Sequence, residues 1–448
     1  MDCKDIFAGK RITVMGLGLL GRGVGDAEFL AKCGAQVLVT DKKSETELAE
    51  SVAKLKQYSN ITFKLGGHDI NDFIQCDMVL KAAGVPLDSA EIAAARAANI
   101  PVVMSTALFA KYASEAGATI VGVTGTRGKS TTAQMIYEVL KAVGKKVLLG
   151  GNVRGISTLA MLPLVEKDTI VVLELDSWQL QGFGELEISP RIGVFTNFYP
   201  DHMNYYKGDM ETYFADKANI FAHQKPGDTL IVGYDVQQRM LQSRFYPKSN
   251  VLLADMHDIV EWGNLTLLGN HNRQNAACAA KALQQLGVEE AMIQKALKTF
   301  SAVPGRLEFV REINRVKIYN DNNATTPEAT AAGLVAVAGL VGNTQPIVLI
   351  MGGSDKGLNM DNLIHEANHI ADKIILLQGT GTERIKDSLT KRKVVVDSLE
   401  QAVSESFKYL QSQDKGGIIL FSPAFASFGM FKNEYERNDQ FVALVKNL

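Results

Sequence analysis

A short loop near the middle of the chain carries the residue types that bind nucleotide phosphates. Within "VGVTGTRGKSTTAQ", residues 121–134, the pattern G-x-x-G-K-S lies between an apolar run and a helical pattern. Glycines let backbone N–H groups approach phosphate oxygens, a helix N-terminus adds positive partial charge, and lysine neutralises β- and γ-phosphate charge. The hydroxyl of Ser130 or Thr131 can ligate Mg²⁺. The spacing departs from the usual G-x-x-x-x-G-K, whose first glycine would fall at Val123. The alternative interpretation is a glycine-rich turn with an exposed lysine. We predict a nucleoside-triphosphate site.

Three further groups near predicted strand ends could act on such a nucleotide. "LELDSWQL" places Glu174 and Asp176 after an apolar strand, where a carboxylate can enter the shell of Mg²⁺, which prefers oxygen ligands. Asp201 and His202 follow another strand, and Lys217 lies on the predicted helix that comes next. Taken one at a time, a solvated strand end, a structural histidine and a solvated lysine explain each of them.

Alternating apolar runs and helical patterns must position these groups. Residues 11–16, 36–41 and 77–84 are typical of buried parallel strands, and residues 21–34 and 89–99 of crossover helices. The same alternation restarts at residue 118 and again near residue 302. Each block predicts a doubly wound α/β sheet, which binds ligands at the carboxyl ends of its strands. We therefore expect three α/β domains that meet at a shared cleft, with the boundaries 1–112, 113–302 and 303–448.

Length and composition exclude several classes of protein. A chain of 448 residues is too long for one hydrophobic core. Lysine and arginine number 47 against 49 aspartates and glutamates, and this balance indicates neither a nucleic-acid nor a membrane partner. The N-terminus lacks the apolar region of a signal peptide. Because the four cysteines form no C-x-x-C pair, we expect no zinc site, no disulfide framework and a cytoplasmic location; they are Cys3, Cys33, Cys76 and Cys278.

Taken together, the candidate segments resemble the Mur ligase family, the ATP-dependent enzymes that assemble the peptide of bacterial cell-wall precursors. The matching pieces occur in order along nearly the whole chain: "GTRGKST", "ELDSWQL", "NFYPDHMNYY", "KANIF", "GNHNRQNAACAA", "VPGRLE", "YNDNNATTPEAT" and "SPAFASFGMFKNEYERNDQF". The last piece is most similar to the members that add D-glutamate. The resemblance implies a Rossmann-like N-terminal domain, a P-loop ATPase-like central domain and a Rossmann-like C-terminal domain.

The resemblance also assigns roles around ATP. The residues that it gives to the ATP phosphates are Gly125, Thr126, Arg127, Gly128, Lys129, Ser130 and Thr131. It implies two magnesium ions, and the residues expected to hold them are Ser130, Glu174, His202 and Lys217. Lys217 matches the lysine that the family carbamylates with CO₂, which suits a metal site because a carbamate is an anion whereas an ammonium would repel the ion. The residues expected at the adenine, phosphate and ribose ends of ATP are Asn275, Arg306 and Asp321. The expected catalytic groups are Lys129, Glu174, His202 and Lys217.

The first block carries a second glycine pattern. "GLGLLG", residues 16–21, follows a strand and on its own predicts NAD(H), but a dehydrogenase does not account for the central segments. In the family this turn receives the uridine diphosphate of UDP-N-acetylmuramoyl-L-alanine. The resemblance places the diphosphate near Leu19 and Leu20 and the uracil near Asp41 and Lys42. Asn152 matches a contact to the sugar-peptide part, and the family's Ser-Pro-Gly reads Ala82-Ala83-Gly84 here.

The third block is expected to bind the incoming amino acid. The residues that match D-glutamate positions are Thr325, Lys356, Ser427 and Phe428. A lysine with hydroxyl and backbone donors suits a dicarboxylate. Departures from the family pattern cluster nearby, at Asn323, Thr326, Phe425 and Glu434, and they leave L-glutamate or another acidic residue as an alternative.

The chemistry implied is amide formation through an acyl phosphate. Transfer of the γ-phosphoryl group of ATP to a carboxylate gives a good electrophile, which an amine then attacks. We therefore expect an ATP-dependent ligase that adds D-glutamate to UDP-N-acetylmuramoyl-L-alanine, acting as a monomer in peptidoglycan precursor synthesis. An alternative of another class is a nucleotide-binding scaffold without catalysis. The joint presence of four expected catalytic groups argues against it: Lys129, Glu174, His202 and Lys217.

Overall fold

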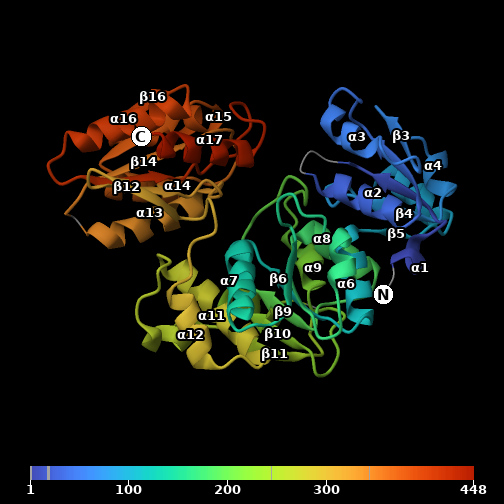
Figure 1. Ribbon diagram of the computed structural model, residues 1–448. Helices are drawn as coiled ribbons and strands as arrows, with labels where there is room; N and C mark the ends of the chain where they lie inside the picture. The colour runs from blue at the N-terminus through green and yellow to red at the C-terminus, as the bar shows by residue number, and fades with distance from the viewer. Residues whose placement is uncertain (1–2, 18–20, 244, 343) are drawn as a thin grey trace. The chain divides into compact units, whose positions relative to one another are not determined.

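The computed structural model describes residues 3–17, 21–243, 245–342 and 344–448. This part of the chain divides into two compact units (Figure 1). The first comprises the chain up to Asp258 together with Asn275–Ala296, and the second comprises Ile259–Gln274 with Leu297–Leu448. Every helix among these described residues is too short or too polar to span a lipid bilayer.

The first unit begins with a parallel sheet in the order β3-β2-β1-β4-β5 (Figure 1, blue). Its strands are β1 (Arg11–Met15), β2 (Gln36–Asp41), β3 (Ile61–Leu65), β4 (Met78–Lys81) and β5 (Val102–Val103). The helices of this segment are α1 (Cys3–Phe7), α2 (Arg22–Lys32), α3 (Ala49–Leu55), α4 (Asn71–Ile74) and α5 (Ala90–Ala97). Central strands of parallel sheets are buried on both faces, which explains the apolar runs of β1 and β4. The strand order reverses between β1 and β4, so their carboxyl ends form the crevice where such sheets bind ligands.

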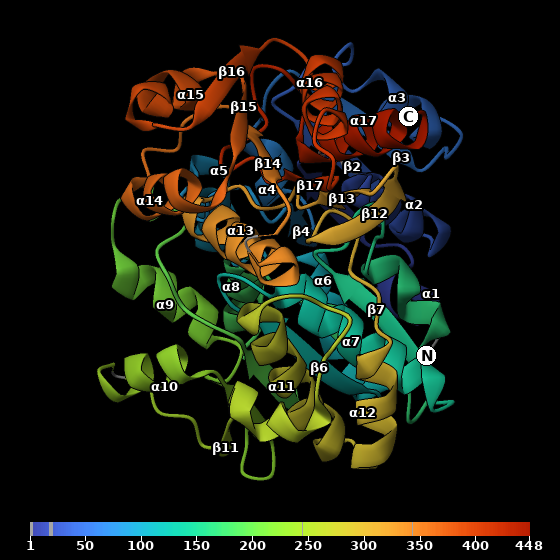
Figure 2. The ribbon, with the colours of Figure 1, turned by 90° about the vertical axis from the view of Figure 1, so that its left-hand side faces the viewer.

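A second parallel sheet follows, in the order β11-β10-β9-β6-β8-β7. Its strands are β6 (Thr119–Thr124), β7 (Val147–Gly151), β8 (Ile170–Glu174), β9 (Ile192–Phe195), β10 (Thr229–Val232) and β11 (Asn250–Leu253). The helices between residues 105 and 298 are α6 (Ser105–Glu115), α7 (Lys129–Ala142), η1 (Leu159–Leu164), α8 (Ser177–Glu185), α9 (Met210–Ala218), α10 (Tyr234–Leu241), η2 (Met256–Trp262), α11 (Asn270–Gln285) and α12 (Glu290–Lys298). α7 packs on β6, β7 and β8 (Figure 2). Because β6 lies between β8 and β9, the segments after these three strands meet at one edge of the sheet.

The second unit contains a mixed sheet in the order β12-β13-β17-β14-β15-β16 (Figure 1, orange and red). Its strands are β12 (Glu308–Ile313), β13 (Val316–Asn320), β14 (Ile347–Gly352), β15 (Lys373–Leu377), β16 (Arg392–Val396) and β17 (Gly417–Phe421). Its later helices are α13 (Pro327–Val341), α14 (Asp361–Ile370), α15 (Thr380–Ile385), η3 (Lys386–Ser388), α16 (Leu399–Gln411) and α17 (Glu434–Lys446). β12 pairs antiparallel with β13, and the other neighbours are parallel. The loops after β13, β17 and β14 therefore lie side by side.

The three sheets confirm the α/β class expected from the alternating sequence. The two sheets of the first unit share one hydrophobic core, which contains Val14 of the first sheet and Val171 of the second. The expected boundary at residues 112 and 113 lies within α6, whose residues Ala107 to Ala110 are buried in that core. The boundaries between domains stay proposals.

The cysteines differ from expectation in one respect. Cys3 in α1 and Cys33, directly after α2, form a disulfide with their Cα atoms 5.6 Å apart, so the expectation of no disulfide framework is wrong for this pair. Their separation of 30 residues concealed the pairing, because the fold brings the start of α1 and the end of α2 together. Cys76 and Cys278 are buried free thiols.

Candidate active site

The loop after β6 adopts a conformation that requires glycine. Gly125 has a φ of +146° and Gly128 a φ of +82°. A Cβ at Gly125 would lie 2.0 Å from Thr196 Oγ1, and one at Gly128 would lie 2.1 Å from Asn275 Oδ1. α7 begins directly afterwards at Lys129. The loop is thus a glycine-lined cradle at a helix N-terminus, which fits a phosphate group.

Two lysine side chains converge on one carbonyl oxygen of this loop. Lys129 Nζ and Lys217 Nζ each donate a hydrogen bond to Gly125 O at 3.0 Å. Lys217 is 1% exposed. Burial, followed by the nearby charge of Lys129, holds the pKa of Lys217 well below its ordinary value of 10.5. This environment favours the neutral amine of Lys217, which is the nucleophilic form.

His202 is held beside these lysines in its neutral form. Its backbone is left-handed, with a φ of +56°, and its ring centroid lies 4.7 Å from that of Trp178. Burial lowers the pKa of His202, and the charge of Lys129 lowers it further, whereas Asp201 raises it. A neutral imidazole is the form that ligates metal ions.

Arg127 joins the phosphate loop to the segment that carries His202. Its backbone N–H donates to Asn197 Oδ1 at 2.8 Å, and its NH1 atom donates to Asp201 Oδ2 at 3.0 Å. Thr126 Oγ1 also donates to the carbonyl of Tyr199 at 3.0 Å. The predicted loop residues and the His202 segment therefore form one connected structure.

Glu174 lies at the same edge of the sheet, at the end of β8. It pairs in register with Val123 of β6 and is 6% exposed. Asn152 Nδ2 donates to Glu174 Oε1 at 3.4 Å, and the Asn152 backbone N–H donates to Glu174 O at 2.8 Å. The Asn152 side-chain oxygen in turn accepts from Arg22 NH1 at 2.8 Å. The structure thus brings Asn152, predicted to contact the acceptor, against Glu174, predicted to ligate magnesium.

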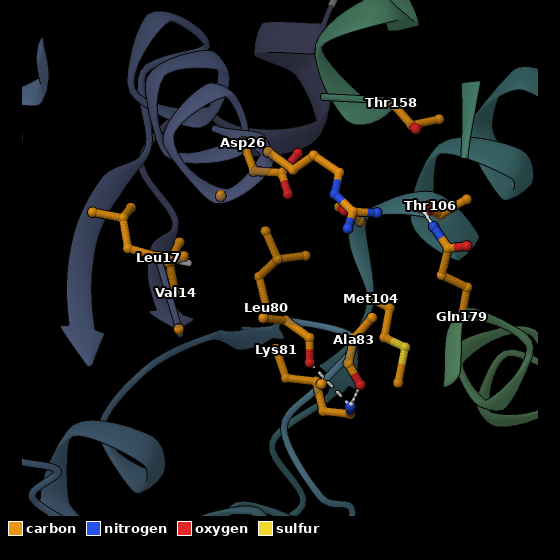
Figure 3. Close-up of a pocket in the computed structure, with 16 residues that line it drawn as sticks. Val14, Leu17, Asp26, Leu80, Lys81, Ala83, Met104, Thr106, Thr158 and Gln179 are labelled. Atoms are coloured by element: carbon orange, nitrogen blue, oxygen red, sulfur yellow. Dashed lines mark hydrogen bonds between the residues drawn. The ribbon is translucent and has the colours of Figure 1, made fainter. Parts of the chain in front are cut away.

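A cavity of about 190 Å³ lies at the carboxyl ends of β1 and β4 (Figure 3). Its walls include Leu17 and Asp26 from one side and Met104, Thr106 and Gln179 from another. The position is the crevice in which a doubly wound sheet binds its ligand. The lining also includes the loop residues Ala82, Ala83 and Gly84, of which the two alanines depart from the family pattern.

The structure describes only some of the residues that were predicted around this cavity. Leu19 and Leu20 lie outside the described residues. Asp41 supports the glycine turn, because its carboxylate accepts from Leu17 N–H at 2.8 Å and from Lys43 N–H at 2.9 Å. Lys42 is exposed.

Lys81 holds the loop that lines the cavity. Its side chain is buried, with 2% exposed. Its Nζ atom donates to the carbonyls of Ala82, Ala83 and Val85 at 3.2, 3.4 and 2.7 Å. Burial lowers the pKa of Lys81 to about 8, against the charges of Asp176 and Glu185, which raise it. The other charged groups that act on it are Arg96, which lowers the pKa, and Asp216, which raises it.

We expect the affinity for UDP to fall as the pH rises above about 8, since Lys81 then loses its positive charge and one of its three N–H donors to the loop. The linkage of one proton limits this fall to about tenfold per pH unit. Titration calorimetry with UDP between pH 7 and 9.5 measures it. Lys81→Met is expected to bind UDP more weakly at pH 7 and to show no such pH dependence. The same slope in wild type and variant would contradict the role of Lys81.

In the second unit, the loops after β13, β14 and β17 bring the predicted amino-acid residues together. Lys356 Nζ donates to Thr325 Oγ1 at 3.1 Å. Ser354, two residues before Lys356, forms a β-bridge with Ala426, next to Ser427. Ser427 is buried and Phe428 is 63% exposed. A lysine, a hydroxyl and nearby backbone donors thus share one edge of this sheet.

Arg437 of α17 ties two of these loops together. It is 0% exposed. Its Nε and NH2 atoms donate to the side-chain and backbone oxygens of Asn322 at 2.8 and 2.9 Å, and NH1 donates to Phe425 O at 3.3 Å. Burial lowers its pKa to about 10, so the guanidinium is charged at neutral pH. One buried cation therefore fixes the loops that carry Thr325 and Ser427.

Arg437→Lys is expected to raise the KM for the amino-acid substrate by about tenfold or more, because one ammonium cannot replace three guanidinium donors (tenfold is about 1.4 kcal/mol). The affinity for UDP should not change. The matched control is Arg311→Lys, since Arg311 NH1 donates to the carbonyls of Val445 and Lys446 near the other end of α17. Steady-state kinetics and thermal unfolding check the result. Equal effects of both substitutions on KM would show that Arg437 has no special role.

Asp321 and Arg306, the predicted ribose and phosphate contacts, also lie together in the second unit. Asp321 accepts from Ser422 Oγ at 2.8 Å and from Leu307 N–H at 3.0 Å. Burial raises the pKa of Asp321 to about 7, against the hydrogen bonds and the charge of Arg306, which lower it. The two residues are thus neighbours near the end of β13.

Asn323 and Phe425, two of the departures from the family pattern, have side chains with local structural roles. Asn323 Nδ2 donates to Pro304 O at 3.4 Å, and the backbone carbonyl of Glu434 accepts from Asn322 Nδ2 at 2.9 Å. Phe425 is 2% exposed, and a Cβ at Gly381 would lie 2.3 Å from its ring. Phe425 therefore fills the space above Gly381, and Asn323 anchors the turn before β12.

Sequence reasoning missed three residues that lie at the candidate sites. Arg22 and Lys81 line the cavity, and Arg437 holds the loops that carry Thr325 and Ser427. The available signals were weak: Arg22 directly follows the glycine turn, and Lys81 is a charged residue at the end of an apolar strand. A charged residue in an apolar run indicates a buried partner, but does not say which one.

The glycine cradle on β6 and the two lysines that share its carbonyl define an α/β protein that binds nucleotide phosphates. Models of three Mur ligase domains match the chain: the MurD-like N-terminal domain at residues 10–104, the middle domain at 123–261 and the glutamate ligase domain at 305–425. The chain belongs to the Mur ligase family. It is therefore an enzyme, an ATP-dependent ligase.

Relatives match over the full length of the chain. A protein of Roseiflexus sp. (strain RS-1), named UDP-N-acetylmuramoylalanine–D-glutamate ligase, is 36% identical, and the match covers 98% of this chain and 99% of the relative. Proteins with the same name are 34% identical in Borreliella burgdorferi (97% of each chain) and 32% identical in Clostridium kluyveri (100% and 99%).

Solved structures share the fold. The MurC ligase of Thermotoga maritima is similar with a TM-score of 0.62 and 21% identity, over 98% of this chain and 99% of that one. The MurF ligase of the same organism, solved in complex with ADP, has a TM-score of 0.60 and 15% identity, over 99% and 97%.

Proposed function

We propose that this ligase joins D-glutamate to UDP-N-acetylmuramoyl-L-alanine with the hydrolysis of ATP, a step of peptidoglycan precursor synthesis. The names of the full-length relatives support the substrates. The observation that carries the chemistry is the convergence of Lys129 and Lys217 on Gly125 O, inside a glycine cradle beside Glu174.

In the proposed reaction, a carboxylate oxygen of the acceptor attacks the γ-phosphorus of ATP, and ADP leaves. The amine of D-glutamate then attacks the acyl carbon, loses a proton, and displaces phosphate together with that carboxylate oxygen. Lys129 neutralises charge on the transferred phosphoryl group, which is the main electrostatic task of such a transfer. The loop residues 125–131 hold the phosphates, with Asn275, Arg306 and Asp321 as further ATP contacts.

The proposed magnesium ligands are Ser130, Glu174, His202 and a carbamate on Lys217. Two Mg²⁺ ions, when bound, would neutralise phosphate charge. As the chain stands, the described residues contain no group of three His, Cys, Asp or Glu side chains that could hold a metal ion. Addition of CO₂ to the neutral amine of Lys217, with release of one proton, would supply the missing anionic oxygen ligand. The lowered pKa of Lys217 supports this reaction, because only the neutral amine attacks CO₂.

The proposed amino-acid site is the edge that carries Thr325, Lys356, Ser427 and Phe428. Lys356 would pair with a carboxylate of D-glutamate, and Thr325 already holds its ammonium in place at 3.1 Å. For the acceptor, we propose the cavity beside β1 and β4 with Asn152, and the segment of Asp41 and Lys42 for the uracil. We further propose that the ligase acts as a cytoplasmic monomer, which analytical ultracentrifugation and cell fractionation test.

The test is phosphate release with UDP-N-acetylmuramoyl-L-alanine and a panel of D-glutamate, L-glutamate and D-aspartate. We expect release to require both the acceptor and an amino acid and to be fastest with D-glutamate by at least about 10²-fold, as differences in buried charged contacts produce. Full-rate ATP hydrolysis without the acceptor, or a preference for L-glutamate, would contradict the proposal.

A further inference from the structure

Arg22 occupies the point where the acceptor cavity meets the proposed magnesium site. It is the first residue of α2, directly after the glycine turn, and it lines the cavity. Its NH1 atom donates to Asn152 Oδ1 at 2.8 Å, and Asn152 Nδ2 donates to Glu174 Oε1 at 3.4 Å. A continuous chain of hydrogen bonds therefore runs from the cavity wall to the carboxylate.

The contact between Arg22 and Asn152 is built into the packing of α2. A Cβ at Gly25 would lie 2.7 Å from Ser157 Cβ, so the helix touches the segment after Asn152 directly. One residue further on, Asp26 Oδ1 accepts a hydrogen bond of 2.6 Å from Ser157 Oγ, within the core of the first unit. Glycine and a buried hydrogen bond thus hold α2 against this segment.

The charges of the cavity suit an anion. Among its described lining residues, Arg22 and Lys81 are basic, and Asp26, which is bonded to Ser157, is acidic. A guanidinium carries five N–H donors, so Arg22 can bind an oxyanion while it keeps its hydrogen bond to Asn152. The N-terminus of α2 adds positive partial charge at the same place.

We propose that Arg22 binds an oxyanion of the acceptor and, through Asn152, positions Glu174 for the magnesium nucleotide. This inference rests on the proposed function, because it takes the UDP-linked acceptor as the ligand of the cavity. Arg22 is a positioning residue: it makes acceptor binding and nucleotide binding support each other. By reciprocity, each ligand strengthens the other by the same factor.

The test is titration calorimetry of the full chain with uridine, UDP and the complete acceptor, and with Mg²⁺·AMP-PNP in the presence and absence of each. For wild type we expect UDP to tighten Mg²⁺·AMP-PNP binding at least about fivefold. For Arg22→Gln we expect UDP affinity to fall about tenfold, uridine affinity to stay unchanged, and the coupling to vanish. If Arg22→Gln weakens binding of the complete acceptor but not of UDP, the oxyanion that Arg22 binds is the terminal carboxylate of the acceptor rather than its diphosphate.

Further variants separate charge from bridging. Arg22→Lys should keep part of the UDP affinity and lose the coupling, because an ammonium is a point charge without the planar fork. The matched control is Lys32→Gln, which removes a cation from the exposed end of the same helix and should match wild type. The double variant with Arg22→Gln and Asn152→Ala should lose no more coupling than either single variant, because both substitutions break the same chain of hydrogen bonds.

The inference would be overturned if Arg22→Gln bound UDP and the complete acceptor as tightly as wild type and kept the same coupling to Mg²⁺·AMP-PNP. Such a result leaves the proposed function intact as long as wild type binds the complete acceptor. If wild type binds neither UDP nor the complete acceptor, the proposed function fails, and the role of Arg22 fails with it.

Discussion

Lys217→Ala is expected to lower kcat by about 10³-fold or more, because it removes the group that we expect to become an anionic metal ligand at the transferred phosphate. Acetate or formate should restore part of the activity, since a small carboxylate can occupy the vacated position. Lys217 is 1% exposed and reaches Gly125 O at 3.0 Å, so the space left by the substitution adjoins the phosphate loop. Phosphate release with increasing acetate measures both effects.

The carbamate itself can be observed. Wild type supplied with ¹³C-bicarbonate should show one carbamate carbon signal that Lys217→Ala lacks. Lys225→Ala is the matched control, because Lys225 is exposed in the segment after α9, and it should keep the signal and the activity. Unchanged activity of Lys217→Ala, or an inactive variant that binds ATP normally and is not rescued by any carboxylate, would count against the carbamate.

Lys129→Met is expected to lower kcat by about 10²- to 10³-fold, the usual loss when one charge-stabilising group is removed. Its ammonium contacts Gly125 O and Thr126 O at 3.0 and 3.2 Å, at the start of α7, where phosphate oxygens would bind. UDP binding should be unaffected, because other described residues line the cavity that we propose for UDP. Kinetics and UDP calorimetry on the same preparation distinguish this outcome from a general loss of folding.

The same substitution should change the pH at which Lys217 reacts with CO₂. The charge of Lys129 lowers the pKa of Lys217, so removing it raises that pKa. The amine of Lys217 then stays protonated up to a higher pH, and the ¹³C carbamate signal should require a higher pH in Lys129→Met than in wild type. A shift to lower pH, or none, would contradict the effect of the Lys129 charge on the pKa of Lys217.

Much of the fold could be predicted from the sequence, because the buried parallel strands carry continuous apolar runs. Residues 36–41 and 170–174 form strands as their β-branched composition predicts. The disulfide of Cys3 with Cys33 could not be predicted, since it depends on how α1 packs near the end of α2. A local pattern predicts an element, whereas a contact between elements depends on the tertiary packing.

The same distinction holds for the sites. The glycine loop is local, and its residue types alone predicted a phosphate site. The convergence of Lys217 on Gly125 O joins residues 92 positions apart, and only the family resemblance pointed to it. Arg22, Lys81 and Arg437 act through backbone carbonyls or amide side chains, which carry no recognisable sequence pattern.

The central claim is ligation through an acyl phosphate, and the most direct test follows the oxygen atoms. UDP-N-acetylmuramoyl-L-alanine labelled with ¹⁸O in its terminal carboxylate is incubated with ATP, Mg²⁺, D-glutamate and the enzyme, and the products are analysed by mass spectrometry. We predict a dipeptide product with one ¹⁸O left in the new amide and inorganic phosphate with one ¹⁸O. Unlabelled phosphate, or label in AMP, would contradict the account.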